Sequence, residues 1–228
     1  MIAPELGWRR LARVITAGLA STATQCACLD YRYVLAIDVE SFSTLSARDQ
    51  ATVQQDLHRL LNQAAERAGL DRKRWQRQPG GDGELAVLPL GTNGLDLVAD
   101  FPRELARALA ESNSQRPRDS RIRLRVAIHH GTLAPGCLGP VGQAPIVVSR
   151  LLDAALLRQA LTRRPNEELV LIISAGLYED VIETRFCGLD PADFDAVDVR
   201  AKGVSYAAYI YSGCAFNSDT APVSAAEP

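Results

Sequence analysis

The sequence is poor in lysine and has no excess of positive charge. Of its 25 basic residues only Lys73 and Lys202 are lysine, and the formal net charge is -2. Nucleic-acid-binding domains usually carry a basic excess, so this charge balance argues against nucleic acid as a partner. Because lysine is so scarce, each of the two deserves a test as a functional residue.

Cysteine and long apolar runs are also lacking. The cysteines, five in number, are scattered, and no histidine cluster accompanies them, which argues against a zinc site or a disulfide framework. Reduced thiols in a cytoplasmic protein are the expected state. No apolar run reaches the roughly 18 residues of a transmembrane helix, so we expect no direct membrane insertion.

What the sequence does contain is typical of one globular domain. The chain has 228 residues, of which 47% are hydrophobic and 23% charged, enough to bury a full core. We predict an N-terminal extension over 1–29, expected to be helical, a single domain over 30–213, and a flexible tail over 214–228.

Periodicity predicts a mixed sheet. A buried strand ends at Asp38, a helix spans 47–68, and two strands flank the glycine-rich turn around Asp82. The later segments are a helix over 95–113 broken near Pro102, a half-buried strand over 121–131, one long helix over 144–164, a buried strand and short helix over 167–183, and a closing strand pair over 194–213. This order favours an α+β (α/β) sandwich of ferredoxin-like character, with helices over one face of the sheet.

Two aspartates stand where chemistry is expected. Asp38 ends a buried strand, and Asp82 lies between glycines in "GGDG". If the first strand pairs with the hairpin, both carboxylates project from one edge and suit a hard divalent cation. The loop Glu40–Thr44 follows at once, and its backbone N–H groups could cradle a phosphate. From these residues alone, a turn or helix-cap role for both aspartates stays open.

The ordered motifs resemble those of class III nucleotidyl cyclases. They are "AIDVESFS", "GGDGELAVLP", "RLRVAIHHGTL", "GQAPIVVSRLLDA" and "VRAKGV", and the resemblance covers about Tyr31 to Gly213. It implies a homodimer with composite active sites at the interface, two divalent cations (Mg²⁺ or Mn²⁺) and a nucleoside triphosphate substrate. The implied reaction is attack of the ribose 3′-hydroxyl on the α-phosphate, which gives a 3′,5′-cyclic nucleotide and pyrophosphate.

The resemblance also implies roles for individual residues. Asp38 and Asp82 would hold the metal ions, with the backbone carbonyl of Val39. Arg150 would stabilise the transition state from the other subunit, and Lys202 would bind the triphosphate. The loop residues expected to cover the triphosphate are Glu40, Ser41, Phe42, Ser43 and Thr44.

The positions that read a purine base depart from the family pattern. Gln78 stands where purine cyclases have lysine or glutamate, Gly139 lies near the expected aspartate or cysteine, and Ile146, after Pro145, replaces the usual asparagine. The short, stand-alone chain resembles the pyrimidine cyclases of bacterial Pycsar anti-phage systems. That resemblance implies a cytoplasmic enzyme that uses UTP, or next CTP, and whose product is read by a separate effector.

Several alternatives remain at this stage. The chain could be an adenylate or guanylate cyclase, a degenerate module that binds a nucleotide or partner without turnover, or a two-metal phosphodiesterase or polymerase-like enzyme. Gln78 could meet a base edge or simply face outward, since its amide offers both a donor and an acceptor. We expect Glu84 to face solvent at the hairpin mouth, and His129 and His130 to cap a strand.

Overall fold

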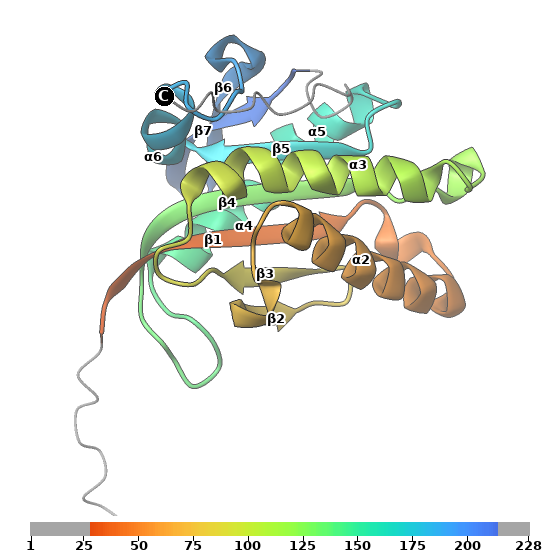
Figure 1. The fold of residues 1–228 in the computed structure, drawn as a ribbon, viewed down its shortest axis with the longest axis horizontal. Coiled ribbons are helices and arrows are strands. Elements are labelled where there is room, and N and C mark those ends of the chain that lie inside the picture. The colour runs from red at the N-terminus through yellow and green to blue at the C-terminus, as the bar shows by residue number, and fades with distance from the viewer. Residues whose placement is uncertain (1–27, 214–228) are drawn as a thin grey trace, which may run out of the picture.

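A mixed seven-stranded sheet forms the centre of the molecule, with strand order β2-β3-β1-β4-β5-β7-β6 (Figure 1). The computed structural model describes residues 28–213, so the predicted N-terminal extension up to residue 27 and the predicted tail lie outside the described residues. The strands are β1 Asp30–Val39, β2 Gln76–Pro79, β3 Gly83–Val87, β4 Leu124–Leu133, β5 Leu169–Ser174, β6 Phe194–Ala201 and β7 Val204–Tyr211. β4 and β5 are parallel and the other neighbours antiparallel.

The helices alternate with these strands along the chain. The α-helices are α2 Ala47–Arg67, α3 Phe101–Asn113, α4 Gln143–Leu152, α5 Ala155–Arg163 and α6 Ala175–Leu177. Single turns of 3₁₀-helix are η1 Phe42–Thr44, η2 Arg72–Arg74, η4 Arg118–Ser120 and η6 Pro191–Asp193, and the π-helical turns are η3 Asp96–Asp100 and η5 Tyr178–Ile182. No helix within residues 28–213 is long and apolar enough to cross a membrane.

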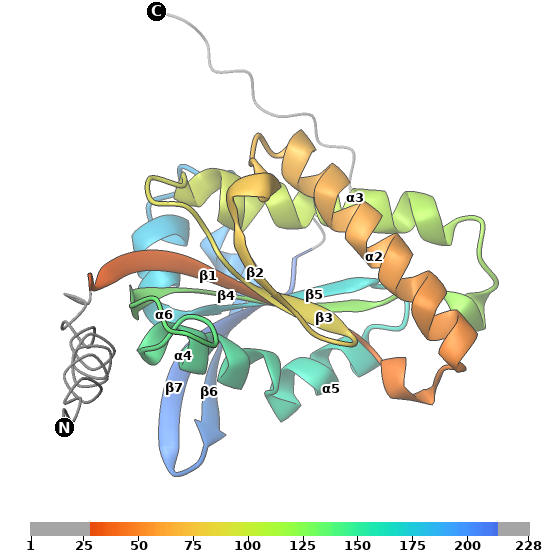
Figure 2. The same cartoon turned by 90° about the horizontal axis from the view of Figure 1, so that it is seen from below.

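Helices cover both faces of the sheet, so the expectation of one covered face is wrong. α2 and α3 lie over one face, and α4 and α5 over the other (Figure 2). The reason is visible in β1, where Val34–Val39 are buried without alternation. Leu35 and Ile37 belong to the core under α2 and α3, whereas Val34 and Ala36 belong to the core against α4 and α5. A strand buried on both sides needs a helical layer on each.

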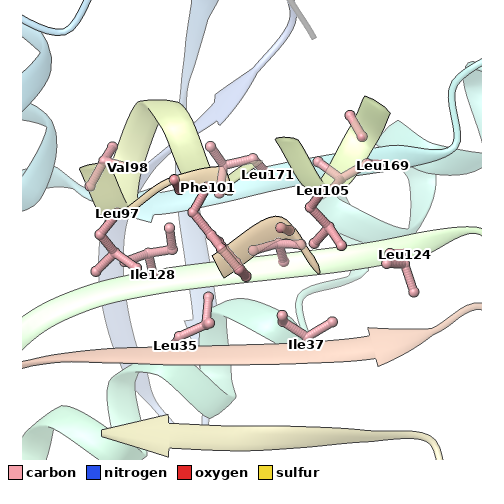
Figure 3. Close-up of a cluster of buried hydrophobic side chains, with 14 of the residues drawn as sticks. Leu35, Ile37, Leu97, Val98, Phe101, Leu105, Leu124, Ile128, Leu169 and Leu171 are labelled. Carbon is pink, nitrogen blue, oxygen red and sulfur yellow. The ribbon is translucent and has the colours of Figure 1, made fainter. Parts of the chain in front are cut away.

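The larger core lies between α3 and the strands β1 and β4 (Figure 3). Phe101 and Leu105 of α3 meet Leu35, Ile37 and Leu124, and all five side chains are almost completely buried. Burying one such side chain stabilises the fold by about 1.5–3 kcal/mol. Packing in this core holds β1 in place along its axis, and this positions Asp38 at the end of the strand.

Two predicted helices differ in detail from the structure. The segment 144–164 is two helices, because the backbone of Ala154 is extended (φ -61°, ψ 131°) between α4 and α5. Pro102 does not break the helix around it. It lies in the first turn of α3, where its missing N–H has no helical partner to lose, and the π-helical η3 leads into it directly.

Candidate active site

The pairing of β1 with β3 brings the two predicted carboxylates to one place. Asp38 lies opposite Gly83, and the Val39 N–H donates to the Asp82 carbonyl at 2.9 Å. A Cβ on Gly83 would lie 1.8 Å from the Ile37 carbonyl oxygen, so only glycine allows this approach. The negative charge of Asp82 acts on Asp38 and is one of the causes that raise its pKa.

The hairpin turn itself is held from several sides. The Gly80 N–H donates to the Gly83 carbonyl at 2.7 Å, and the Gln54 side chain of α2 donates to the Gly81 carbonyl at 2.6 Å. The Asp82 side chain is exposed and has no hydrogen bond or ion pair with any residue of 28–213. The turn therefore fixes the Asp82 backbone and leaves its carboxylate available to a ligand.

Asp38, by contrast, already has a partner. Arg125 of β4, directly opposite in the ladder, donates from Nε to Oδ1 and from Nη2 to Oδ2, both at 2.7 Å. Only 9% of Asp38 is exposed. Burial raises the pKa of the Asp38 carboxyl above its ordinary value, while Arg125 acts in the opposite direction and Asp82 and Asp153 add to the rise. The guanidinium thus spans both oxygens that a metal ion would use.

The donor set fits a divalent cation on one condition. Among residues 28–213 no three His, Cys, Asp or Glu side chains gather as a ready metal cluster. Two carboxylates on neighbouring strands are still the hard oxygen ligands that Mg²⁺ or Mn²⁺ takes from a protein, with water and substrate phosphates as the rest of the shell. Asp38 and Asp82 fit such an ion once Arg125 leaves Asp38.

The loop Glu40–Thr44 divides into structural and exposed residues. Ser41 has a left-handed backbone (φ 57°) that turns the chain into η1. Glu40 forms an ion pair with Arg123 at 2.7 Å, and the partly buried Phe42 packs against the core. The exposed side chains of the loop are Ser41, Ser43 and Thr44. The predicted triphosphate contact from Glu40–Thr44 stays a prediction.

Within residues 28–213 neither Arg150 nor Lys202 forms a hydrogen bond or ion pair with Asp38. Arg150 lies in the last turn of α4 and makes no hydrogen bond or ion pair within residues 28–213. Lys202 is exposed in the β6–β7 turn with φ 49°. β7 runs parallel to β1, so Lys202, just before β7, lies at the sheet end opposite Asp38. The hairpin projects away from the sheet in Figure 2.

Gln78 lies against the loop between β4 and α4. Its Nε2 donates to the Leu138 carbonyl at 2.9 Å across a sequence separation of 60 residues. Gly139 has φ 125°, and a Cβ there would lie 1.6 Å from Gln78 Nε2. The two positions that depart from the purine pattern are therefore in direct contact. Leu138, with 98% of its surface exposed, and Ile146, with 45%, leave this side of α4 apolar.

The expectation that Glu84 faces solvent is wrong. Its side chain is 7% exposed and forms an ion pair with Arg72 at 2.5 Å, beneath α2. Arg72 also donates to Asn62 Oδ1 at 2.6 Å and lies near the Trp75 ring. The reason is register: Glu84 pairs with Ile37, so it shares the face of β1 that α2 covers.

The two histidines of β4 have structural surroundings. His129 Nδ1 lies 2.8 Å from the Ser174 hydroxyl, and burial lowers the pKa of His129 to about 4. His130 stacks on Tyr33 with ring centroids 4.1 Å apart. Both stand several residues from Asp38 along the ladder. This placement agrees with a role in holding the strand.

Sequence reasoning missed Arg125, Gln54 and Asp153 as residues of the site. The alternation in "RIRLRVAIHH" placed Arg125 on one face of its strand, but only the β1–β4 register sets it opposite Asp38. Gln54 was hidden among the polar residues of an amphipathic helix. Asp153 lies three residues after Arg150, and no sequence pattern marked it as a functional residue.

Comparison with solved structures identifies the fold. The guanylyl cyclase Cya2 superposes with a TM-score of 0.59 at 17% identity, over 82% of this chain and 94% of that one. An adenylate/guanylate cyclase/hydrolase from Silicibacter pomeroyi gives 0.57 at 18% identity, over 82% and 99%. The guanylate cyclase domain of RhGC from Catenaria anguillulae, in complex with GTP, gives 0.53 at 16% identity, over 80% and 96%.

Sequence comparison adds nothing to this: no protein-family model and no curated protein matches the chain. The structural similarity confirms the predicted fold, that of the class III nucleotidyl cyclase catalytic domain.

Proposed function

We propose that this chain, which has the fold of class III cyclase catalytic domains, is a nucleotidyl cyclase. The observation that carries the proposal is the meeting of Asp38 and Asp82 at one sheet edge, with Asp82 presented by a turn that leaves its carboxylate without a partner within residues 28–213. These carboxylates, with the Val39 carbonyl, would hold two Mg²⁺ or Mn²⁺ ions.

In the proposed reaction the ribose 3′-oxygen of a nucleoside triphosphate attacks the α-phosphorus. The new P–O bond closes the ring, the bond to the β-phosphate oxygen breaks, and pyrophosphate leaves while the 3′-hydroxyl proton passes to water. The metal ions would supply charge neutralisation on the attacking and leaving oxygens. The exposed loop residues Ser41, Ser43 and Thr44, and Gln78 on β2, would orient the triphosphate and base, so that catalysis rests on positioning.

A homodimer is part of the proposal. Lys202 lies near the start of β7, about nine residues from the sheet end that carries Asp38, or roughly 30 Å at about 3.3 Å per residue. A lysine that binds the same triphosphate as Asp38 must therefore come from a second copy. We propose the same for Arg150, whose planar guanidinium suits charge on the phosphorus in the transition state.

For the base, we propose a pyrimidine, UTP first and CTP second. Gln78 and Gly139 replace the residues by which the family recognises purines, and Gln78 uses its Nε2 on the Leu138 carbonyl, leaving Oε1 as an acceptor. The cyclic product would act in anti-phage defence through a separate effector, in the cytoplasm. The competing proposal is a purine cyclase, because the solved structures of similar fold are named as adenylate and guanylate cyclases.

The test is one incubation with all four nucleoside triphosphates and Mn²⁺, with products resolved by mass spectrometry. The proposal expects a cyclic pyrimidine nucleotide with release of pyrophosphate, and loss of both in Asp38→Asn. A cyclic purine product would support the cyclase activity and contradict the proposed pyrimidine preference. Consumption of cyclic or linear nucleotides in the hydrolytic direction would instead favour a phosphodiesterase.

A second candidate is a module that binds a nucleotide without turnover. Two observations favour it: Arg125 forms a bidentate pair with Asp38, and Ile146, after Pro145, stands where the family usually has asparagine. Binding of a triphosphate by calorimetry, together with no product after long incubation in Mg²⁺ or Mn²⁺, would establish it.

A further inference from the structure

The pair between Arg125 and Asp38 joins two side chains that are largely buried but still reach solvent. Arg125 is 14% exposed and Asp38 12%, by side chain, and the two bonds of 2.7 Å engage both carboxylate oxygens. A bidentate charge-assisted pair of this kind is stronger than a single hydrogen bond. In this structure Asp38 is thus satisfied by an internal cation.

A divalent cation on Asp38 would need the same oxygens. It would also place a double positive charge beside the guanidinium, and the two repel. Arg125 and the metal ion therefore compete for Asp38: each carboxylate oxygen already accepts one bond from the guanidinium, and the two positive charges repel. Binding of an ion is expected to weaken or displace the bidentate pair.

The fold supplies a second acceptor for Arg125. Asp153 follows α4 and is exposed, and its carboxylate makes no hydrogen bond or ion pair within residues 28–213. α4 packs on β1 and β4, on the face of the sheet that carries the pair, and Asp153 is the residue at its C-terminal end; the charge of Asp153 also acts on Asp38. On Arg125, Nε and Nη2 are used and Nη1 has no partner among the described residues. Among the described residues, a carboxylate and a donor without partners thus belong to elements packed on the same face of the sheet as Asp38.

We propose that Arg125 is an internal competitor that sets the metal affinity of the site, held by Asp38 without metal and passed to Asp153 when an ion binds. The inference rests on the proposed function in taking Asp38 as a metal ligand, but it concerns binding and not turnover. Mn²⁺ alone, without nucleotide, is therefore the probe.

The experiment titrates Mn²⁺ into the metal-stripped full chain and follows free Mn²⁺ by electron paramagnetic resonance. Arg125→Gln should bind about tenfold tighter than wild type, the effect of removing a competitor of about 1.4 kcal/mol. Arg121→Gln, which removes the same charge from the same segment at a pair of 3.8 Å with Glu168, should leave the affinity unchanged. Equal or weaker binding by Arg125→Gln overturns the proposal, since Arg125 would then orient Asp38 instead of competing for it.

The role of Asp153 needs a double-mutant cycle, because its charge alone also attracts a cation. Asp153→Asn should weaken Mn²⁺ binding several-fold in the wild type and have little effect in the Arg125→Gln background. An equal loss of Mn²⁺ affinity in both backgrounds would contradict the proposal that Arg125 passes to Asp153. If Arg125→Gln does not fold, Arg125→Lys is the alternative variant, because it keeps the positive charge but cannot form the bidentate pair. Its Mn²⁺ affinity should lie between that of wild type and the tenfold gain. Binding no tighter than wild type contradicts the proposal.

These outcomes separate the inference from the cyclase proposal. If Arg125→Gln binds Mn²⁺ more tightly but the protein forms no nucleotide product, the cyclase proposal is contradicted and the competition between Arg125 and the metal ion is supported. If the protein turns over a nucleotide but Arg125→Gln has the same Mn²⁺ affinity as wild type, the competition is contradicted and the cyclase proposal is supported.

Discussion

Two arginine–carboxylate pairs lie on opposite faces of the sheet. Arg125 holds Asp38 on the face of α4, and Arg72 holds Glu84 on the face of α2. Neighbouring positions in the ladder carry them, since Asp38 pairs with Gly83 and Ile37 with Glu84. One pair thus lies directly behind the other, across the thickness of the sheet.

The surroundings of the two pairs differ. Around Asp38 stand Asp82 and Asp153, both exposed carboxylates that offer Arg125 or a cation another partner. Around Glu84 the neutral Asn62 and the ring of Trp75 flank Arg72, and both charged side chains are at most 7% exposed. The same chemistry serves as a separable contact in the first case and as a permanent one in the second. Competing ligands, more than bond geometry, decide which role a pair takes.

The largest expected effect comes from the carboxylate that neither pair uses. Asp82→Asn should lower Mn²⁺-dependent turnover at least about 100-fold, because it removes a metal ligand on which the transition state depends. The melting temperature should stay near that of wild type, since the exposed Asp82 side chain makes no hydrogen bond or ion pair within residues 28–213. Product formation and calorimetric melting are the measurements.

Asp119→Asn, at an exposed site in η4, is the matched control for that experiment and should change neither quantity. Full turnover by Asp82→Asn would contradict the metal role of the hairpin.

Breaking the permanent pair should cost stability first. Glu84→Ala leaves Arg72 charged and buried, and we expect a loss of about 3–5 kcal/mol in the free energy of unfolding. Chemical denaturation measures it. Replacing both partners, Glu84→Leu with Arg72→Met, should recover most of the loss, because a buried pair can be exchanged for apolar packing. If the single variant is as stable as wild type, the two pairs do not differ as described.

A pH titration of stability identifies the part of the acid sensitivity that comes from His129, which belongs to neither ion pair. The pKa of His129 is lowered to about 4 in the folded protein, so between about 6.5 and 4 the unfolded chain binds more protons. Stability should therefore fall as the pH falls through this window. His129→Gln should flatten that part of the curve, measured by denaturation at several pH values. An unchanged slope in the variant would assign the acid sensitivity to the carboxylates.

The smallest effect is expected at the contact between α2 and the β2–β3 turn. Gln54 of α2 donates to the Gly81 carbonyl behind Asp82. Gln54→Ala should cost about 0.5–1.5 kcal/mol of stability, and raise KM a few-fold through a less fixed Asp82. Gln55→Ala, one residue further along the exposed surface of α2, is the control. A change in kcat with KM unchanged would argue for a different role of Gln54.

The sequence predicted the elements of the site better than their contacts. The strand ending at Asp38 and the "GGDG" hairpin were predicted from apolar runs and turn residues, and the structure pairs them as expected. Partners across strands and layers were not predicted, because they depend on register and on which helix covers which face. Arg125 and Arg72 are two of many arginines in the chain, and no local sequence pattern singles either of them out. The two-faced burial of β1 had the same cause, since an unbroken apolar run does not say how many layers cover it.

The contact between Gln78 and Gly139 limits how the base preference of such a site can change. Any side chain at 139 would displace the Gln78 amide, and at φ 125° the backbone itself disfavours every residue except glycine. A single substitution that introduces a base-reading carboxylate at 139 would thus strain the loop and free Gln78 at once. For protein engineering the strand and the loop form one unit, in which position 78 and the backbone of 136–142 must be redesigned together.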